Sequence, residues 1–146
     1  MSFAIDANVL LYASDASSPK HAAAANFLRA CAESGGLFCL AWPTIMAYLR
    51  IATHPKIFAT PLAPQKAEQN IQQLLDLGHC RVIDSSGIDF WGTYIALSRD
   101  YHPRGNLVPD LQLAAILKAN GIKRLFTCDR DFRRFDFLEI IDPTRS

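Results

Sequence analysis

The sequence lacks the features of membrane and secreted proteins. No apolar run reaches the roughly 18–20 residues that a transmembrane helix needs. The first residues, MSFAIDANVLLYASD, contain no Lys or Arg and place Asp6 inside their apolar stretch, whereas a signal peptide has the opposite pattern. We therefore expect a cytoplasmic protein that does not associate with a membrane.

Cysteine is too sparse and too irregularly spaced for a metal site or a disulfide framework. The four cysteines form no CxxC pair and no cluster with histidine, so zinc is not expected: Cys31, Cys39, Cys80, Cys128. Buried, reduced thiols are the simpler interpretation. The sequence also has no GxSxG, no GxxxxGK[ST] and no GxGxxG, so the main motifs of serine hydrolases and nucleotide-binding proteins are absent.

What the sequence does contain is enough apolar material for one domain. The chain has 146 residues, of which 50% are hydrophobic and 20% are charged, so a single folded domain is expected and disorder is not. Fifteen Lys and Arg against fourteen Asp and Glu give a formal net charge of +1. This balance argues against a histone-like polycation, but it does not exclude an enzyme that acts on nucleic acid, because local charge decides contact with a phosphate backbone.

Short apolar strands alternate with helical patterns along the chain. The strands are expected at residues 3–5, 37–41, 81–83, 124–127 and 138–141. Helices are expected from Asn8 as a cap, over 21–33, 43–52 and 65–77, after Ser85 and Ser86 as caps, and from Asp110 to 119. The alternation predicts an α/β/α sandwich with a mainly parallel central sheet, covering residues 1–146 as a single domain.

Aspartates fall where an open parallel sheet binds its ligands, beyond the carboxyl ends of the strands. Asp6 follows the first strand, Asp129 follows the strand at 124–127 with Asp131 two residues on, and Asp110 opens a helix that can face the same edge. Carboxylates gathered in one cleft repel each other unless a cation neutralises them, and oxygen ligands suit Mg²⁺ or Mn²⁺. The pattern therefore suggests metal-dependent phosphoryl chemistry.

Each acid also has an ordinary explanation. Asp110 can complement a helix dipole, and Asp129 and Asp131 can lie in a solvated turn with local ion pairs. For these acids both interpretations stay open. Asp6 lies between Ile5 and Val9, where a carboxylate is costly unless something pairs with it, so a functional role is favoured there.

Basic residues are concentrated in one part of the chain. Residues 99–134 carry eight of the fifteen Lys and Arg and four acids. A basic rim around an acidic centre fits a polyanionic substrate, although on charge alone an ordinary charged surface is favoured. Arg50 lies in an apolar helical stretch, from which it can extend to solvent, to the acids or to a partner's carboxylate.

Four segments resemble one known family. Residues 5–12 (IDANVLLY) resemble the opening DxNVLLY of PIN-domain ribonucleases, and residues 49–58 (LRIATHPKIF) resemble their central LRxATHPxxF segment. Residues 110–115 (DLQLAA) look like the family's DxxLAA helix start, and residues 127–132 (TCDRDF) look like its TxDxDF motif. The segments occur in family order and span nearly the whole chain. Together they are most similar to the VapC toxins of bacterial toxin–antitoxin pairs.

The resemblance implies a PIN fold and an Mg²⁺- or Mn²⁺-dependent endoribonuclease, with tRNA, rRNA or mRNA as its substrate. It also implies a VapB-like antitoxin that blocks the site, and a homodimer. Trp42, Tyr48 and Phe58 can face such an antitoxin or a second subunit, or can belong to the core, which is favoured for most of them; Trp91 is expected in the core or in an interface.

The resemblance also assigns roles to individual residues. Asp6 and Asp110 would be metal ligands, Asp129 a further ligand or a carboxylate that orients water, and Asp131 a catalytic helper. Asn8 and Thr127 would order this first shell by hydrogen bonds. Arg50 and Arg130 are candidates for contact with RNA or antitoxin.

One position departs from the family pattern. Many PIN domains carry a glutamate in the helix before the LRxAT segment, where this chain has Ala47, and no acid occurs between Glu33 and Glu68. The site would then consist of three or four aspartates, which suggests a weaker or single metal site.

Three hypotheses follow. In the leading one, a metal held by Asp6, Asp110 and Asp129 activates a water that attacks an RNA phosphodiester and stabilises the leaving 3′-oxygen. A second is a catalytically weak or inactive PIN-like module that acts by binding a partner protein. A third is a phosphate-accepting receiver-like regulator, which would need an acidic pair after the first strand, where only Asp6 occurs.

Overall fold

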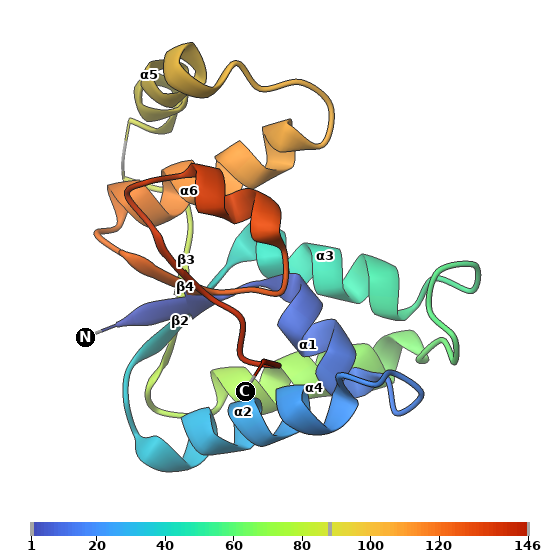
Figure 1. The fold of residues 1–146 in the computed structure, drawn as a ribbon. Coiled ribbons are helices and arrows are strands. Elements are labelled where there is room, and N and C mark those ends of the chain that lie inside the picture. The colour runs from blue at the N-terminus through green and yellow to red at the C-terminus, as the bar shows by residue number, and fades with distance from the viewer. Residues whose placement is uncertain (1, 88, 146) are drawn as a thin grey trace.

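A five-stranded parallel sheet forms the centre of the computed structural model, which describes residues 2–87 and 89–145 (Figure 1). The strand order is β3-β2-β1-β4-β5, and every neighbouring pair is parallel. The strands are β1 (Phe3–Ile5), β2 (Phe38–Ala41), β3 (Cys80–Ile83), β4 (Arg124–Phe126) and β5 (Glu139–Ile141). The predicted mainly parallel sheet is therefore confirmed, and its strands lie close to the predicted ranges.

The strand order places a topological switch at the centre of the sheet. From β1 the chain builds outward through β2 to β3, and it then returns to build β4 and β5 on the other side of β1. The connections that leave β1 and β4 consequently diverge, which opens a crevice beyond the carboxyl ends of these two strands. Residues 5–12 and 127–132, the first and fourth of the segments that resemble the PIN family, begin at this crevice.

Helices cover both faces of the sheet. They are α1 (Ala7–Ser14), α2 (His21–Ser34), α3 (Trp42–Ala52), α4 (Pro64–Leu75), α5 (Phe90–Tyr101) and α6 (Leu107–Ala119), with a 3₁₀ helix, η1 (Arg130–Arg134). In Figure 1, α5 and α6 lie above the sheet, whereas α1, α2 and α4 lie below it. The layers make up the predicted α/β/α sandwich.

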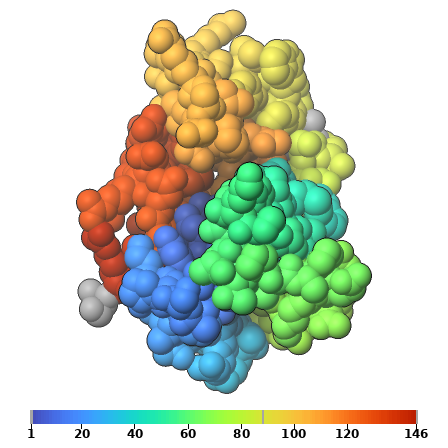
Figure 2. Space-filling view, turned by 90° about the vertical axis from the view of Figure 1, so that its right-hand side faces the viewer, coloured from blue at the N-terminus to red at the C-terminus, as the bar shows by residue number. Residues whose placement is uncertain are grey.

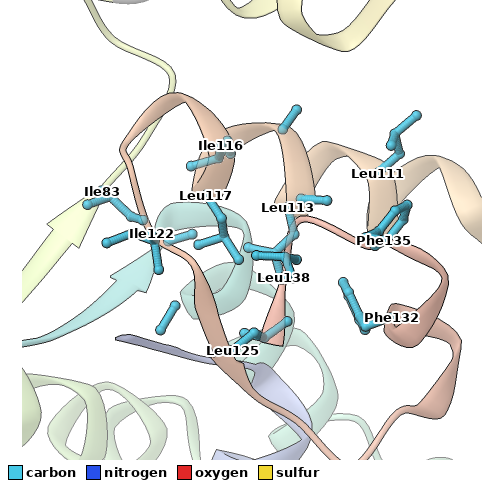
Figure 3. Packing of buried hydrophobic residues seen from close by; sticks show 14 of the residues in the cluster. Ile83, Leu111, Leu113, Ile116, Leu117, Ile122, Leu125, Phe132, Phe135 and Leu138 are labelled. Atoms are coloured by element: carbon cyan, nitrogen blue, oxygen red, sulfur yellow. The ribbon is translucent and has the colours of Figure 1, made fainter. Parts of the chain in front are cut away.

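Two apolar clusters hold the layers together, one on each face of the sheet. Successive residues of β1, β2 and β3 enter opposite clusters, as Ala4 and Ile5 do in β1. Helix α6 is apolar on several sides because it packs on the sheet and is itself covered by α5 and η1 (Figure 3). Its buried side chains are Leu111, Leu113, Ala114, Ala115, Ile116 and Leu117. This packing fixes α6, and with it Asp110, relative to β4.

Three helix starts differ from the sequence-based prediction. Asp6, rather than Asn8, caps α1 through a hydrogen bond from the Ala7 amide at 2.8 Å. Asp89, rather than Ser85 or Ser86, caps α5 by accepting the Gly92 amide at 3.0 Å. Helix α6 begins at Leu107, three residues before Asp110. Proline at position 109 is tolerated there because the first amides of a helix have no partner inside the helix.

The aromatic residues divide between core and surface. Tyr48 and Phe58 are buried as predicted, but Trp42 is 43% exposed and Trp91 is 68% exposed. Most of the three residues favoured for the core are thus buried, and for Trp42 and Trp91 an interface remains the prediction. Trp42 is the first residue of α3, where the chain turns away from the sheet edge. All four cysteines are free thiols, two of them buried. In the described part of the chain, no helix is long and apolar enough to cross a membrane.

Candidate active site

The ends of β1 and β4 are joined where the crevice begins. The Asp6 amide donates to the Phe126 carbonyl at 3.0 Å, and the Thr127 amide donates to the Ile141 carbonyl at 2.9 Å. These bonds extend the parallel ladder by one residue on each strand. Asp6 and Thr127 are thereby held side by side, although 121 positions separate them in the sequence.

A hydrogen-bond network orders the carboxylate of Asp6. The Thr127 hydroxyl donates to Asp6 Oδ2 at 2.8 Å and accepts from Asn8 Nδ2 at 3.0 Å and from the Asp129 amide at 3.1 Å. Asn8 Oδ1 in turn accepts the Cys128 amide at 3.1 Å. A hydroxyl has one proton and two lone pairs, so Thr127, which is 1% exposed, uses its full capacity here.

Asp110 and Asp131 face the same space from α6 and η1. Burial raises the pKa of Asp110 to about 6, and the negative charges of Asp129, Asp6 and Asp131 add to this effect, while Arg134 opposes it. Asp6, Asp129 and Asp131 thus lie near enough to Asp110 for their charges to act on it. Asp131 is the most peripheral, because it is exposed and lies 3.9 Å from Arg134 in a surface ion pair.

Asp6 is the most deeply placed of the four. Burial raises its pKa, and the charge of Asp129 acts in the same direction, whereas the hydrogen bonds from Thr127 and the Ala7 amide lower it. The result is a carboxylate whose negative charge is only partly compensated by the surrounding protein. The expectation that Asp6 is costly without a charge partner agrees with this environment.

The donor set suits a hard cation that keeps part of its hydration shell. Within residues 2–87 and 89–145, no three Asp, Glu, His or Cys side chains are arranged to hold one ion directly. Mg²⁺ commonly binds through one or two carboxylates and keeps several waters or substrate oxygens. The negative charges of Asp6, Asp129 and Asp131, which raise the pKa of Asp110 against the opposing charge of Arg134, supply what such an ion needs. Asp6, Asp110 and Asp129 therefore remain the predicted ligands.

The crevice opens into a hollow on one face of the molecule. Figure 2 shows this hollow among the start of α1 in dark blue, α6 in orange, the segment after β4 in red, and the blue-green end of α3. Helix α3 contributes no carboxylate to it, as the sequence with Ala47 required. The fourth acid of the cluster comes instead from η1, as Asp131.

Arg50 and Arg130, the predicted contacts with RNA or antitoxin, lie on the surface. Arg50 is exposed in the last turn of α3, and Arg130 is exposed at the start of η1. Their contacts with a partner remain a prediction. Arg50 is not buried in the apolar stretch that surrounds it in the sequence, because its side chain extends to solvent.

The sequence analysis missed the turn that follows β5. Asp142 accepts hydrogen bonds from the amide and hydroxyl of Thr144 and from the thiol of Cys128. Its neighbour Arg145 lies 3.5 Å from Asp142. The signal available in the sequence was the triplet Asp142-Pro143-Thr144, a typical turn sequence in which the Asp side chain bonds to the backbone two residues on.

Comparison with known proteins connects this arrangement to one family. The PIN-domain family model matches residues 3–138. Ribonuclease VapC48 of Mycobacterium tuberculosis is 38% identical over 143 residues, which cover 98% of each chain.

Two solved structures share the fold at low sequence identity. The structure of Mycobacterium tuberculosis VapC20, a Sarcin-Ricin loop cleaving toxin, aligns with a TM-score of 0.68 at 15% identity, covering 96% of this chain and 99% of that one. VapBC2 from Rickettsia felis, solved bound to a DNA fragment from their promoter, aligns with a TM-score of 0.66 at 18% identity, covering 96% and 97%.

Proposed function

Because the chain belongs to the PIN-domain family, and within it to the VapC ribonucleases, we propose that it is a metal-dependent endoribonuclease. We propose further that it is the toxin of a VapBC-type pair and acts in the cytoplasm. The observation that supports the activity is the crevice at the sheet switch, where the charges of Asp6, Asp129 and Asp131 act on Asp110, and that of Asp129 acts on Asp6. Such a concentration of carboxylates suits the binding of a phosphodiester only together with a cation.

In this proposal each residue of the crevice has a separate task. Asp6, Asp110 and Asp129 hold Mg²⁺ or Mn²⁺, and Asp131 assists from the rim. A bound ion of this kind lowers the pKa of a coordinated water and stabilises negative charge on phosphate oxygens. Thr127 and Asn8 fix the carboxylate of Asp6 and the backbone at Asp129, so both acids face the substrate without reorganisation.

The proposed protein partner is a VapB-like antitoxin. Helices α1, α2, α3 and α4 enclose a groove of about 520 Å³ with an apolar lining, which includes Leu10, Leu28, Leu74 and Leu77. Its charged lining residues are Arg29 and Lys66, with no carboxylate among them. An apolar segment that carries acidic side chains would suit this groove. We propose that the antitoxin supplies such a segment.

The proposed homodimer would cover apolar side chains that are exposed in the monomer. Trp42 is 43% exposed and Met46 is 52% exposed, one helical turn apart on α3. Aromatic residues and methionine are enriched at protein interfaces. Mass measurement by light scattering tests the dimer, and Met46→Lys should shift the mass towards the monomer.

The activity is tested with the purified full-length chain, freed of any bound partner. Total bacterial RNA is incubated with Mn²⁺, Mg²⁺ or EDTA, beside Asp6→Asn and Asp110→Asn. The exposed Asp100, on the outer helix α5, supplies the matched control Asp100→Asn. Discrete cleavage that needs metal, is lost in both crevice variants and is kept in the control would support the proposal, and mapping the fragment ends would identify the target. Equal cleavage by parent and crevice variants would refute it.

A second candidate function is a PIN-like module that binds a partner but cleaves weakly or not at all. The lack of a carboxylate on α3 favours it, together with the lack of a preformed triad of metal ligands in the described residues. Titration calorimetry with Mn²⁺ separates the two functions. Binding that is lost in Asp110→Asn supports the nuclease, whereas negligible binding by the parent with RNA intact supports the binding module.

A further inference from the structure

A second, shallow pocket adjoins the carboxylate crevice and has the opposite charge. It lies between η1 and the turn after β5, and Asp129 forms part of its wall. Three of its eight lining residues are arginines: Arg130 and Arg133 from η1, and Arg145 from the turn. Two neighbouring segments, η1 and the turn after β5, therefore place three arginines around a pocket that Asp129 also lines.

The turn that carries Arg145 is attached firmly to the end of β4. Asp142 accepts from the Thr144 amide at 2.9 Å, from the Thr144 hydroxyl at 2.6 Å and from Cys128 Sγ at 3.4 Å. Burial acts to raise the pKa of Asp142, but these hydrogen bonds outweigh it, and the pKa stays below its usual value. Asp142 thus fixes the turn beside Cys128, directly before Asp129.

The charge balance around the pocket is positive. Arg130, Arg133 and Arg145 line it, and Lys20 is close enough to influence the pKa values of both Cys128 and Asp142. The lining acids are Asp129 and Asp142, and Arg145 already pairs with Asp142 through Nε at 3.5 Å.

Two of these guanidinium groups are available for a ligand. Among the residues that the structure describes, neither Arg130 nor Arg133 forms an ion pair. Both side chains are exposed, and they come from a single short 3₁₀ helix. Guanidinium groups bind phosphate oxygens through paired hydrogen bonds, so an unpaired cluster of them suits a phosphodiester.

We propose that Arg130, Arg133 and Arg145 bind the backbone phosphate that neighbours the cleaved bond in the RNA strand. This proposal rests on the proposed ribonuclease function. Because Asp129 lines both the crevice and the pocket, a strand whose reacting phosphate lies over the carboxylates passes directly onto the arginines. The arginines also offset the repulsion between the polyanion and the acidic crevice. They are positioning residues, which hold the strand in register with the carboxylates.

Binding is measured without cleavage, on the full-length chain in EDTA. The probe is a fluorescently labelled single-stranded RNA oligonucleotide, and its anisotropy gives Kd at several salt concentrations. The test variant is Arg130→Gln/Arg133→Gln, and Arg145→Gln is examined separately. The matched control, Arg81→Gln/Lys123→Gln, removes the same charge from two exposed residues. Arg81 lies on the edge strand β3, and Lys123 lies directly before β4, at the end of that strand away from the crevice. Melting temperatures confirm that each variant is folded.

The proposal predicts a weaker and less salt-dependent complex. The Arg130→Gln/Arg133→Gln variant should raise Kd about tenfold and lower the slope of log K against log salt by about 0.7, since neutralising one phosphate of a single strand contributes about 0.7. The control should stay within about twofold of the parent. Equal Kd and slope in test and control variants would overturn the proposal. So would unchanged RNA binding with weakened antitoxin binding, which would assign the arginines to the protein partner.

A parallel cleavage assay separates this proposal from the function on which it rests. If the parent cleaves RNA with Mn²⁺ while the arginine variants bind and cleave like the parent, the phosphate site is wrong and the nuclease stands. If the arginine variants lose RNA binding but the parent never cleaves with any metal, the phosphate site is supported and the nuclease is wrong.

Discussion

Replacing Asp110 by Asn should stabilise the metal-free protein while it weakens metal binding. Burial and the charges of Asp129, Asp6 and Asp131 raise the pKa of Asp110 to about 6 from 3.8. Ionised Asp110 therefore makes the folded state less stable than a neutral residue would at that position. Asparagine has nearly the same shape and carries no charge.

The size of the effect follows from the pKa difference. A shift of about 2 units corresponds to about 3 kcal/mol. Because Asp110 is partly exposed, solvent screening reduces this to about 1–2 kcal/mol. Its carboxylate in the first turn of α6 also interacts favourably with the helix dipole, which is worth about 0.3–1 kcal/mol and is weakened in the variant. We expect a net stabilisation of about 1 kcal/mol, or about 2–4 °C in Tm for a chain of this size.

The pH dependence has a definite sign. Between about pH 4 and 6 the folded state binds more protons at Asp110 than the unfolded state does, so the penalty disappears as the pH falls through this range and is fully present above it. The lowered pKa of Asp142 acts in the opposite direction, because it stabilises the folded state at a pH above the pKa of the unfolded state. The difference between parent and variant removes this shared contribution.

The assay is urea unfolding in EDTA from pH 4.5 to 8, with the exposed Glu68→Gln as the charge-matched control. The Asp110→Asn variant should be more stable than the parent at pH 7.5, and the difference should shrink towards zero near pH 4.5. Adding Mg²⁺ should stabilise the parent and have much less effect on the variant. A variant that is less stable than the parent at pH 7.5, or a difference independent of pH, would refute the reasoning.

Three further substitutions test the network, the groove and the core. Thr127→Val removes the buried hydroxyl of the site and should weaken Mn²⁺ binding, measured by calorimetry, about 10–100-fold. Thr127→Ser keeps the hydroxyl and should keep most of the Mn²⁺ affinity. Equal losses of affinity in the two variants would contradict a role for the hydroxyl. Tyr48→Phe removes bonds to Ser14 and Asn70 at the groove and should cost about 1–2 kcal/mol in urea unfolding, and an unchanged midpoint would count against these bonds. Leu125→Ala empties a fully buried position in β4 and should cost about 2–5 kcal/mol in the same assay; a loss below 1 kcal/mol would show that the cluster can close the cavity.

The fold was largely predictable because its strands are short apolar runs between breakers, and its helices carry apolar residues at helical spacing. The caps were harder to predict, and Asn8 shows why. Its side chain can cap a helix, but in the structure it bonds to Thr127 and to the Cys128 amide, more than a hundred residues away. Local propensity therefore gave way to a long-range partner, and Asp6 became the cap instead.

The candidate site was predictable in its residues but not in its geometry. The position of Asp6 after a buried strand already indicated an unusual carboxylate. Whether Asp110 and Asp129 approach it depended on the strand order, which places β4 next to β1 and α6 over the crevice. The strand order cannot be predicted from the spacing of residues in the sequence. A helix-dipole role for Asp110 and a solvated turn at Asp129 therefore remained open until the fold was known.

The arrangement around Asp129 explains how a chain with a net charge of +1 can suit a polyanion. The crevice gathers Asp129 with Asp6, Asp110 and Asp131, whereas the adjoining pocket, which Asp129 also lines, gathers arginines of η1 and of the last turn. An acidic crevice and a basic pocket thus lie next to each other. Non-specific attraction to nucleic acid stays weak because the charges cancel at long range, beyond the Debye length. Close to the surface they do not cancel, so in the proposed site the arginines would hold the phosphates of a strand, and a cation at the aspartates would add to this attraction.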